Sequence, residues 1–302
     1  MKHFLTLKGL TKKDLIKIIK KAVLIKKFPW RYSRSLKNKT LLMLFAKPSL
    51  RTRLSFETGM TQLGGHAIFY SINDSPLGEK ETIYDTAAVA SKYVDIIMAR
   101  LYEHSDIEAL ACKSSVPVIN ALTNFSHPCQ ILGDLLTIIE KKGRPDNLKL
   151  VYAGDSNNNV THSLMYGTSI MGIEMIVCCP KNKKFMPNPE VIKETQVKVV
   201  HNISDAFKGA DIVYTDSWMS YHIPKHQKKL RMKILRHYQV TYSMMSKAKK
   251  DAIFMHCLPA QRGMEVTAEV IDGKQSVVID QAENRLHVQK ALMIWLLDNL
   301  KR

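Results

Sequence analysis

The sequence predicts an α/β fold made of two open parallel-sheet domains, each built from alternating strands and helices. The chain has 302 residues, which exceeds one ordinary open-sheet core and fits two domains of about 150 residues each. Its composition, 45% hydrophobic and 24% charged, is typical of a folded globular protein. Short apolar runs alternate with longer helical patterns along the chain, as in the βαβ units of a parallel sheet.

An amphipathic helix opens the chain. Thr11 can cap this helix together with Asp14, and apolar residues then recur at helical spacing, at Leu15, Ile18, Ile19, Ala22 and Val23. The pattern that follows predicts strands at 40–45, 66–72, 95–99 and 116–121, and helices at 53–63, 85–93, 106–113 and 128–142. This rhythm indicates a parallel sheet in the first half of the chain.

A break rich in turn formers separates the two halves. It reads Lys-Gly-Arg-Pro-Asp-Asn at 142–147, and we place the domain boundary here because a buried-type strand restarts the pattern at 148–153. Further strands are expected at 175–179, 197–201, 211–215, 252–256 and 277–280, with helices between them and a long amphipathic helix at 282–300. The second half should therefore form its own open sheet.

The formal net charge of +18 could indicate a nucleic-acid or anionic-membrane partner. The lysines, however, recur along 12–27, 141–149, 181–184 and 225–233, and we interpret each stretch as a solvated helix face or loop. No zinc-finger, basic-zipper or aromatic-rich RNA motif accompanies the charge. We therefore expect neither nucleic acid nor a membrane as a partner.

The sequence is typical of a cytoplasmic protein with free thiols. The N-terminal residues contain no apolar run long enough for a signal peptide or a span of about 20 residues. The five cysteines form no C-x-x-C pair and are odd in number, which argues against a disulfide framework or a four-cysteine zinc site.

Ligands of open parallel sheets gather beyond the carboxyl ends of the strands, and three polar clusters follow strands of the first half. The first, at 47–53, reads Lys-Pro-Ser-Leu-Arg-Thr-Arg and can hold a phosphate dianion with hydroxyls, backbone N–H groups and two arginines. Taken alone, this cluster slightly favours a capped helix with exposed arginines. Arg100 ends the strand at 95–99, and His127 and Gln130 follow the strand at 116–121, so cationic and donor groups recur at adjacent strand ends.

The polar clusters of the second half are of a different kind. The clusters lie at 155–159, 216–220 and 256–259, each after a predicted strand. They supply carboxylates, amides, hydroxyls and a thiol, which suit an amino-acid zwitterion better than a second phosphate. The turn at Gly154 lacks the G-x-G-x-x-G spacing of a dinucleotide site, so we expect no cofactor. We also expect no metal, because His256 and Cys257 are consecutive and should point to opposite faces of a strand.

Together these clusters resemble the aspartate/ornithine carbamoyltransferase family over nearly the whole chain. The S-x-R-T-R turn at Ser49, the H-P-x-Q turn at His127 and the H-C-L-P turn at His256 occur at family-like separations. Cys257 in the last turn and the D-x-W-x-S segment at 216–220 are similar to the ornithine branch. The resemblance implies transfer of a carbamoyl group from carbamoyl phosphate to the side-chain amine of L-ornithine, giving L-citrulline and phosphate in arginine metabolism.

The resemblance also implies the site residues. Carbamoyl phosphate would be bound by Ser49, Leu50, Arg51, Thr52, Arg100, His127, Gln130, Cys257, Leu258 and Arg285. Ornithine would be held by Asn159, Asp216, Ser220 and Tyr221. The residues with a catalytic part would be Arg51, Arg100, His127, Asp216 and Cys257. The implied domains are a carbamoyl-phosphate domain, 1–146 with the C-terminal helix 286–302 packed back on it, and an ornithine domain, 147–285. The implied assembly is a homotrimer.

The expected chemistry follows from the charges. An alkyl amine with a pKa of about 10.4 is protonated at neutral pH, so presenting it as a nucleophile costs roughly 4 to 5 kcal/mol. We expect domain closure to desolvate the amine near Asp216 and Cys257, while His127 and Arg51 stabilise the oxyanion and the arginines stabilise the departing phosphate.

Four departures from the family pattern, at five positions, keep other functions open. Leu50 replaces a threonine, Pro76 a glutamine and Asn157 an arginine, while Tyr221 and His222 replace the Met-Gly of the S-M-G loop that closes over ornithine. Histidine in place of glycine loses access to positive φ, so a carbamoyltransferase acting on a different amine is the first alternative. The second is a basic binding protein that uses its charge on nucleic acid with little catalysis.

Overall fold

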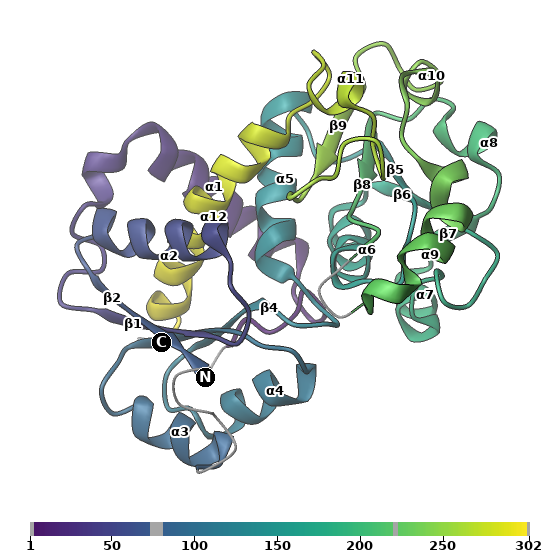
Figure 1. Ribbon diagram of the computed structural model, residues 1–302. Coiled ribbons are helices and arrows are strands. Elements are labelled where there is room, and N and C mark those ends of the chain that lie inside the picture. Colours follow the sequence, from purple (N-terminus) through teal and green to yellow (C-terminus); the bar gives the residue numbers. More distant parts are fainter. Residues whose placement is uncertain (1–2, 73–80, 220–222, 301–302) are drawn as a thin grey trace. The chain divides into compact units, whose positions relative to one another are not determined.

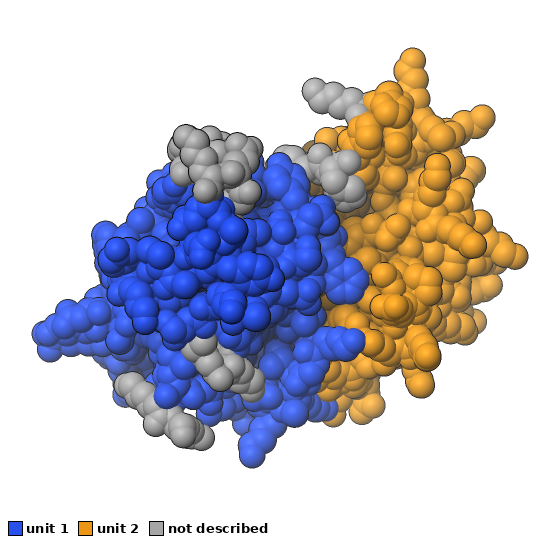
Figure 2. Space-filling model, turned by 90° about the horizontal axis from the view of Figure 1, so that it is seen from below, with its two compact units in different colours: residues 1–136, 283–302 blue, residues 137–282 orange. Residues whose placement is uncertain are grey.

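The computed structural model describes residues 3–72, 81–219 and 223–300, and it divides into two compact units (Figure 2). Unit 1 comprises residues 1–136 and 283–302, and unit 2 comprises residues 137–282. The division falls inside two helices, α5 (Pro128–Lys142) and α12 (Val278–Asp298). The C-terminal helix thus packs mainly with the N-terminal part of the chain, as expected.

Unit 1 contains a parallel sheet with the strand order β2-β1-β3-β4 (Figure 1). Its strands are β1 (Thr40–Phe45), β2 (His66–Ser71), β3 (Ile96–Arg100) and β4 (Val118–Leu122). β3 lies inside the sheet and is buried along its whole length, because helices cover both faces of the sheet.

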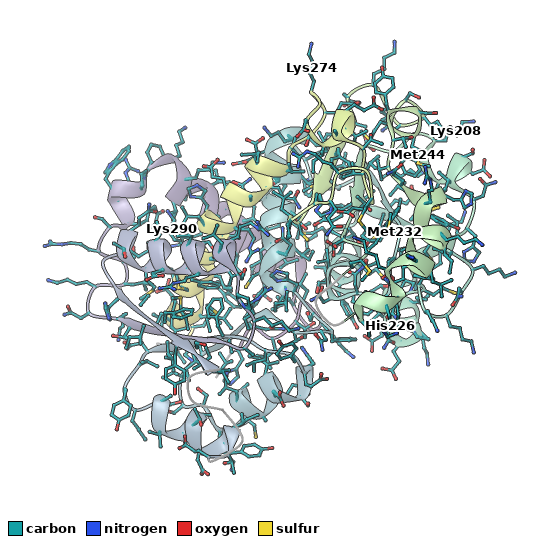
Figure 3. The ribbon with its side chains drawn as sticks, in the orientation of Figure 1. Lys208, His226, Met232, Met244, Lys274 and Lys290 are labelled. Atoms are coloured by element: carbon teal, nitrogen blue, oxygen red, sulfur yellow. The ribbon has the colours of Figure 1, made fainter. Side chains whose placement is uncertain are left out.

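The helices of unit 1 form a layer on each face of this sheet (Figure 1). α3 (Ile83–Ala90) and α4 (His104–Lys113) cover one face, where their apolar residues form a core cluster with β1, β3 and β4. α1 (Lys12–Lys27), the short η1 (Pro29–Tyr32), α2 (Leu50–Gln62) and α12 cover the other face. Lys290 of α12, labelled in Figure 3, donates to Gln62 of α2 at 2.7 Å and so joins two distant parts of the chain.

Unit 2 contains a five-stranded parallel sheet with the order β7-β6-β5-β8-β9. Its strands are β5 (Lys149–Ala153), β6 (Glu174–Cys178), β7 (Lys198–Val200), β8 (Ile212–Thr215) and β9 (Ile253–His256). Its longest helix besides α5 and α12 is α6 (Asn159–Met171), and shorter helices follow: α7 (Pro189–Thr195), α8 (Ile203–Phe207), η3 (Lys225–Gln227), α9 (Lys228–Leu235), η4 (Arg236–Tyr238), α10 (Tyr242–Met245) and α11 (Ala268–Ile271).

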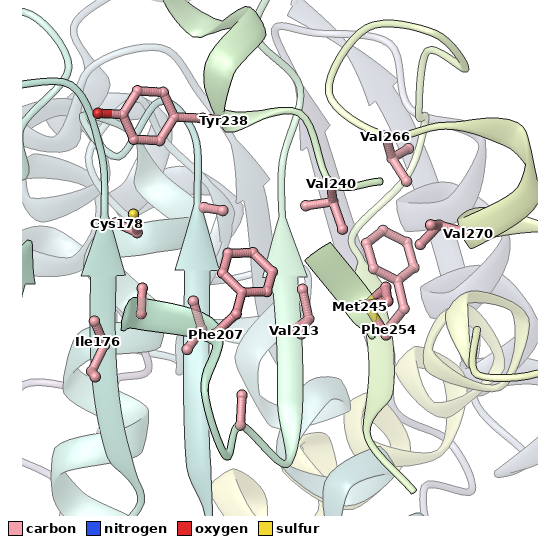
Figure 4. Packing of buried hydrophobic residues seen from close by; sticks show 14 of the residues in the cluster. Ile176, Cys178, Phe207, Val213, Tyr238, Val240, Met245, Phe254, Val266 and Val270 are labelled. Carbon is pink, nitrogen blue, oxygen red and sulfur yellow. The ribbon is translucent and has the colours of Figure 1, made fainter. Parts of the chain in front are cut away.

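One core cluster of unit 2 lies on one face of its sheet (Figure 4). Side chains of the strands, such as Val213 of β8 and Phe254 of β9, pack against Phe207, Val240 and Val270 from the segments that cover them. All five of these side chains are at most 5% exposed. Burial of this apolar surface stabilises the sheet whose strand ends carry the polar clusters.

The structure confirms the α/β fold and nine of the ten predicted strands. The strand expected at 277–280 is wrong, because these residues join Ser276 to α12 and Val278 already begins that helix. A short apolar run fits a strand or a buried helix equally well, and here Ile279 is 73% exposed while Val278 is buried, as on two faces of a helix. The capping box at Thr11 and Asp14 is confirmed.

Both sheets reverse their strand order beside the first strand of each unit. In unit 1, the chain continues from β1 to β2 on one side and then to β3 on the other. In unit 2, it continues from β5 to β6 on one side and later to β8 on the other. Such switch points leave a crevice at the carboxyl ends of the strands, so they are where ligands are expected. No helix among the described residues is both long and apolar enough to cross a bilayer.

Candidate active site

The turn after β1 forms the start of α2 and has the features of an anion site. Ser49 caps the helix, since its side chain accepts from the backbone N–H of Thr52 at 3.4 Å and its hydroxyl donates to the Thr52 hydroxyl at 3.0 Å. The first-turn N–H groups have no partner within an α-helix, and the helix dipole favours negative charge at this end. Leu50, the first residue of α2, is 72% exposed.

His127 lies at the centre of a group of cations in unit 1. It is 5% exposed and precedes α5, and burial first, then the charges of Arg285, Arg100 and Arg51, hold the pKa of His127 well below its ordinary value. The imidazole is therefore neutral at physiological pH and can donate one N–H without repelling the arginines. The structure thus brings three arginines close to His127, although two of them, Arg100 and Arg285, are 185 residues apart in the sequence.

Arg285 is fixed by α5. Its guanidinium donates to Oε1 of Gln130 at 2.7 Å, and the side-chain amide of Gln130 donates to Asp134 at 2.9 Å. A Cβ atom on Gly133 would lie 3.2 Å from Cδ of Arg285, so glycine at this position leaves room for the arginine. The predicted residues Gln130 and Arg285 are therefore neighbours in one hydrogen-bonded chain.

The site of unit 2 is built around a carboxylate and a thiol. Asp216, which follows β8, is 6% exposed, and its Oδ1 accepts from the Ser217 backbone at 2.8 Å and from Sγ of Cys257 at 3.0 Å. Burial raises the pKa of Asp216, and the neighbouring His256 and Cys257 act in the opposite direction. A buried carboxylate that also accepts a hydrogen bond from a thiol is suited to hold an alkyl ammonium group.

His256 holds the turn that carries Cys257, the hydrogen-bond partner of Asp216. Its Nδ1 accepts from the Leu258 backbone at 2.9 Å, so its proton lies on Nε2, which faces Oε1 of Glu265 at 3.5 Å. Both side chains are fully buried. Leu258 has φ +55, and the hydrogen bond to His256 helps to hold this turn of the backbone.

The expectation that His256 and Cys257 point apart was wrong. The chain turns at Leu258, directly beyond the end of β9, and ligand-type atoms of Asp216, His256 and Cys257 all lie within 4.8 Å of one another. Such a trio could hold a metal ion, although Asp216 and Cys257 already share a hydrogen bond. That no metal takes part stays a prediction.

The turn after β5 is held by a buried ion pair. Arg231 of α9 pairs with Asp155, and its Nε donates to the Trp218 carbonyl at 2.8 Å. Burial raises the pKa of Asp155 to about 6, while the charge of Arg231 acts in the opposite direction. Gly154, with φ +126, allows close packing, since a Cβ there would lie 3.1 Å from Nε1 of Trp218. These contacts join the turns that carry Asn159 and Asp216.

The remaining predicted residues fall into two groups. Asn159 is half-buried as the first residue of α6, and its neighbour Asn158 caps that helix by accepting from Thr161 at 2.8 Å. Ser220 and Tyr221 lie outside the described residues, as do Pro76 and His222, two further positions at which the chain departs from the family pattern.

Sequence reasoning missed Arg231 and Glu265. Arg231 stands in the lysine-rich stretch 225–233 that was interpreted as solvated, yet it is 8% exposed. The available signal was helical spacing, because Arg231 and the buried Leu235 lie four residues apart on one face of α9. Glu265 gave no local signal, since its partner His256 is on another element.

Comparisons with known proteins cover both units. Residues 2–140 match the carbamoyl-P binding domain of aspartate/ornithine carbamoyltransferases, and residues 146–296 match the Asp/Orn binding domain. An ornithine carbamoyltransferase of Thermococcus kodakarensis is 47% identical, with 98% of this chain and 96% of that protein covered. One of Oceanobacillus iheyensis is 48% identical, with 98% and 94% covered.

Solved structures agree with these matches. The ornithine carbamoyltransferase of Pyrococcus furiosus superposes with a TM-score of 0.93 at 45% identity, covering 98% of this chain and 97% of that one. The ornithine transcarbamoylase of Giardia lamblia gives 0.90 at 44% identity with the same coverage. An acetylornithine transcarbamylase complexed with acetylcitrulline gives 0.88 at 29% identity, covering 98% and 99%.

Proposed function

The chain belongs to the aspartate/ornithine carbamoyltransferase family, and we propose that it transfers the carbamoyl group of carbamoyl phosphate to the side-chain amine of L-ornithine. The products are L-citrulline and phosphate. The observation that carries this proposal is the group of Arg51, Arg100 and Arg285 around a neutral His127. Three guanidinium groups beside a neutral imidazole suit a small, doubly charged anion.

We assign carbamoyl phosphate to residues 1–146 with the helix at 286–302, together with Arg285, which directly precedes that range. The phosphate accepts hydrogen bonds from the Ser49 and Thr52 hydroxyls, from the first-turn N–H groups at Leu50 and Arg51, and from the arginines. The neutral His127 donates to the carbonyl oxygen, which becomes more negative as the amine attacks. Gln130 accepts from Arg285 and keeps a second lone pair on Oε1 for the carbamoyl NH₂ group.

We assign ornithine to residues 147–285. Asn159, Asp216, Ser220 and the backbone at Tyr221 hold its α-amino and α-carboxylate groups, while Cys257 and Leu258 face the carbamoyl group and the reactive amine. The hydrogen bond from Cys257 to Asp216 supports a shared role for these two residues, because it keeps the carboxylate oriented in a buried place. His256 and Glu265 hold the turn that presents Cys257.

The reaction balances without a covalent enzyme intermediate. The neutral amine nitrogen forms a bond to the carbamoyl carbon, the bond from that carbon to the phosphate oxygen breaks, and the leaving group takes the electron pair. The proton lost by the nitrogen ends on the phosphate. The arginines of unit 1 stabilise the charge that develops on the leaving group, which lowers the barrier because they are fixed before the reaction begins.

Ornithine is favoured over another amine by the named relatives. The curated ornithine carbamoyltransferases named as relatives are 44 to 49% identical to this chain, and those of solved structure are 33 to 45% identical, whereas the acetylornithine transcarbamylase is 29% identical. Asp216 and Cys257 also fit a free ammonium group. Purified protein should be incubated with carbamoyl phosphate and ornithine, N-acetylornithine, lysine, putrescine or aspartate, and ureido products and phosphate measured. The highest kcat/KM with ornithine supports the proposal, and a higher value with another amine overturns the substrate.

We further propose a cytoplasmic homotrimer that works in the biosynthetic direction, toward arginine. Exposed apolar side chains of β2 and α2 support self-association of unit 1, since Leu54, Ile68 and Phe69 are 54%, 42% and 36% exposed. Relatives from Pyrococcus furiosus and Campylobacter jejuni are described as anabolic. Light scattering of the purified protein tests the assembly, for which a monomeric mass is the contrary result.

A further inference from the structure

A second buried amide holds Arg285, one of the three arginines around His127. Gln289 is fully buried and lies four residues after Arg285 on α12, so the two side chains share one face of this helix. It has none of the roles assigned above. A buried amide needs hydrogen-bond partners, because leaving its oxygen and nitrogen unsatisfied costs free energy, so its partners indicate what it does.

The partners of Gln289 are Arg285 and Ser55. With the amide oriented to satisfy both, its oxygen accepts from Nε of Arg285 at 3.0 Å and from Nη2 at 2.9 Å, and its nitrogen donates to the Ser55 hydroxyl. Nε and Nη2 form one edge of the planar guanidinium, so an oxygen that accepts from both fixes the plane of the group. Gln289 thus orients Arg285 along this edge, while Gln130 accepts from Nη1.

The hydrogen bond to Ser55 joins this arginine to the first turn of α2. The Ser55 hydroxyl can accept from Gln289 because its own proton is donated to the Thr52 carbonyl at 3.2 Å. The Thr52 hydroxyl in turn accepts from Ser49 at 3.0 Å. Gln289 therefore connects two parts of the proposed phosphate site that are far apart in the sequence, the turn after β1 and the arginine of α12.

The two amides hold Arg285 without neutralising it. Gln130 and Gln289 carry no charge, whereas a glutamate in either place would accept the same hydrogen bonds and form an ion pair with the guanidinium. Arg285 is 3% exposed, and charges interact more strongly in such a place than in water. A neutral acceptor thus leaves the positive potential of the site for an anion.

We propose that Gln289 is a positioning residue of the carbamoyl-phosphate site, which orients Arg285 as a neutral acceptor and ties it to the first turn of α2. This inference rests on the proposed function. Gln289 acts through Arg285 and Ser55, and no contact with the substrate is assigned to it. Two variants separate its features, because methionine removes the hydrogen bonds at similar side-chain length, and glutamate keeps the acceptor and adds a charge.

The test measures anion binding in the absence of an amine. Inorganic phosphate and carbamoyl phosphate are titrated by calorimetry into the full chain, as wild type, Gln289→Met and Gln289→Glu, at constant pH and ionic strength. We expect Gln289→Met to weaken binding of both anions by about tenfold, because Arg285 loses the acceptor that fixes its plane. Gln289→Glu should weaken binding further, by roughly 30-fold, because the new carboxylate neutralises Arg285 and repels the dianion.

Steady-state kinetics separate positioning from a general loss of structure. In both variants, KM for carbamoyl phosphate should rise by about the factor seen in binding. KM for ornithine at saturating carbamoyl phosphate should stay within about twofold of wild type, because Asp216 and Cys257 belong to unit 2. A variant that had lost structure in general would lose affinity for both substrates, which would overturn the inference.

Gln62→Met is the matched control. Gln62 ends α2 and also accepts, through its amide, from a cation of α12, since Lys290 donates to it at 2.7 Å. The variant removes the same kind of bond between the same two helices, about 18 Å along α2 from Leu50. We expect less than about a twofold change in phosphate affinity, because Arg285 keeps its acceptors. An equal effect of Gln62→Met and Gln289→Met would show general packing of the helices and would overturn the inference.

The outcomes separate this inference from the proposed function. Gln289→Met that binds phosphate like wild type overturns the inference, and so does Gln289→Glu that binds phosphate at least as tightly as Gln289→Met, even where citrulline is formed. Weaker binding in the expected order without any ureido product from ornithine overturns the proposed function and leaves the role of Gln289 in place. Should Gln289→Met fail to fold, Gln289→Glu against wild type decides alone, and equal affinity overturns the inference.

Discussion

The two units use one strand arrangement for opposite chemistry. Both sheets reverse beside their first strand, and both carry polar turns at that point. Unit 1 places arginines there, and burial lowers the pKa of His127 and Lys47, whereas unit 2 places carboxylates there, and burial raises the pKa of Asp155 and Asp216. In each unit burial favours the neutral form, so the shifts have opposite signs because the groups have opposite charges.

The units also differ in how their sites are supported. In unit 1, Lys47 after β1 contacts Asn124 after β4 and Tyr102 after β3 directly, and α12 adds one distant residue, Arg285. In unit 2, the turns depend on partners from other elements, such as Arg231 for Asp155 and Glu265 for His256. We expect variants in unit 1 to act mainly on catalysis and variants in unit 2 to act on stability as well.

Arg51→Ala should give the largest effect, and it tests the expectation that variants in unit 1 act mainly on catalysis. We expect kcat/KM for carbamoyl phosphate to fall by about 10³-fold, because a fixed donor to the developing charge is lost together with a phosphate contact. Steady-state kinetics measure this. Arg53→Ala is the control, since Arg53 is exposed and pairs with Glu57 at 3.0 Å. Wild-type turnover and carbamoyl phosphate affinity in Arg51→Ala would refute the assignment.

Arg231→Met tests how much the buried ion pair between Arg231 and Asp155 stabilises unit 2. It leaves the Asp155 carboxylate buried without its ion-pair partner, and we expect a loss of about 3 kcal/mol in the free energy of unfolding, at the low end for such a break because Asp155 can take up a proton. Urea unfolding measures it. Arg231→Met combined with Asp155→Asn should recover part of the loss. A double variant no more stable than Arg231→Met would contradict the idea that the uncompensated charge is the cause.

The pH dependence of the free energy of unfolding tests the role of Asp155 in the stability of unit 2. The pKa of Asp155 is about 6 in the folded chain and 3.8 in the unfolded one, so its contribution to stability is greatest below pH 3.8 and is lost as the pH rises toward 6. About two pKa units correspond to about 3 kcal/mol at most. The unfolding free energies of wild type and Asp155→Asn should diverge across this window, with Asn gaining relative to wild type. A constant difference from pH 4 to pH 7 is the contrary outcome.

Cys257→Ser should give the smallest effect. A serine hydroxyl can still donate to Asp216, as the thiol does at 3.0 Å, so we expect kcat to fall by about tenfold or less and the affinity for ornithine to change little. Cys257→Ala removes the donor and should lower kcat further. Equal losses in both variants would show that the hydrogen bond to Asp216 is unimportant.

The sequence predicted unit 1 better than unit 2 for a physical reason. Apolar runs located the strands of both sheets, and the residues directly beyond β1, β3 and β4 were recognised because strand ends of a parallel sheet meet at one edge. The support of unit 2 was missed because a lysine-rich stretch gives no sign that one arginine turns inward, as Arg231 does. The turn at Leu258, which brings Cys257 toward Asp216, was equally invisible in a strand pattern of period two.

The division of the chain also sets the order in which the site of unit 1 can be completed during synthesis. Residues 1–136 leave the ribosome first, but Arg285 belongs to the segment 283–302 and is made last. All 146 residues of unit 2 are added in between, which takes roughly 7 to 30 seconds at about 5 to 20 residues per second. Throughout that time His127 and Gln130 lack their guanidinium neighbour, and Gln62 lacks the lysine that α12 brings to it. A nascent chain can therefore fold the whole ornithine-binding half before its carbamoyl-phosphate site is complete.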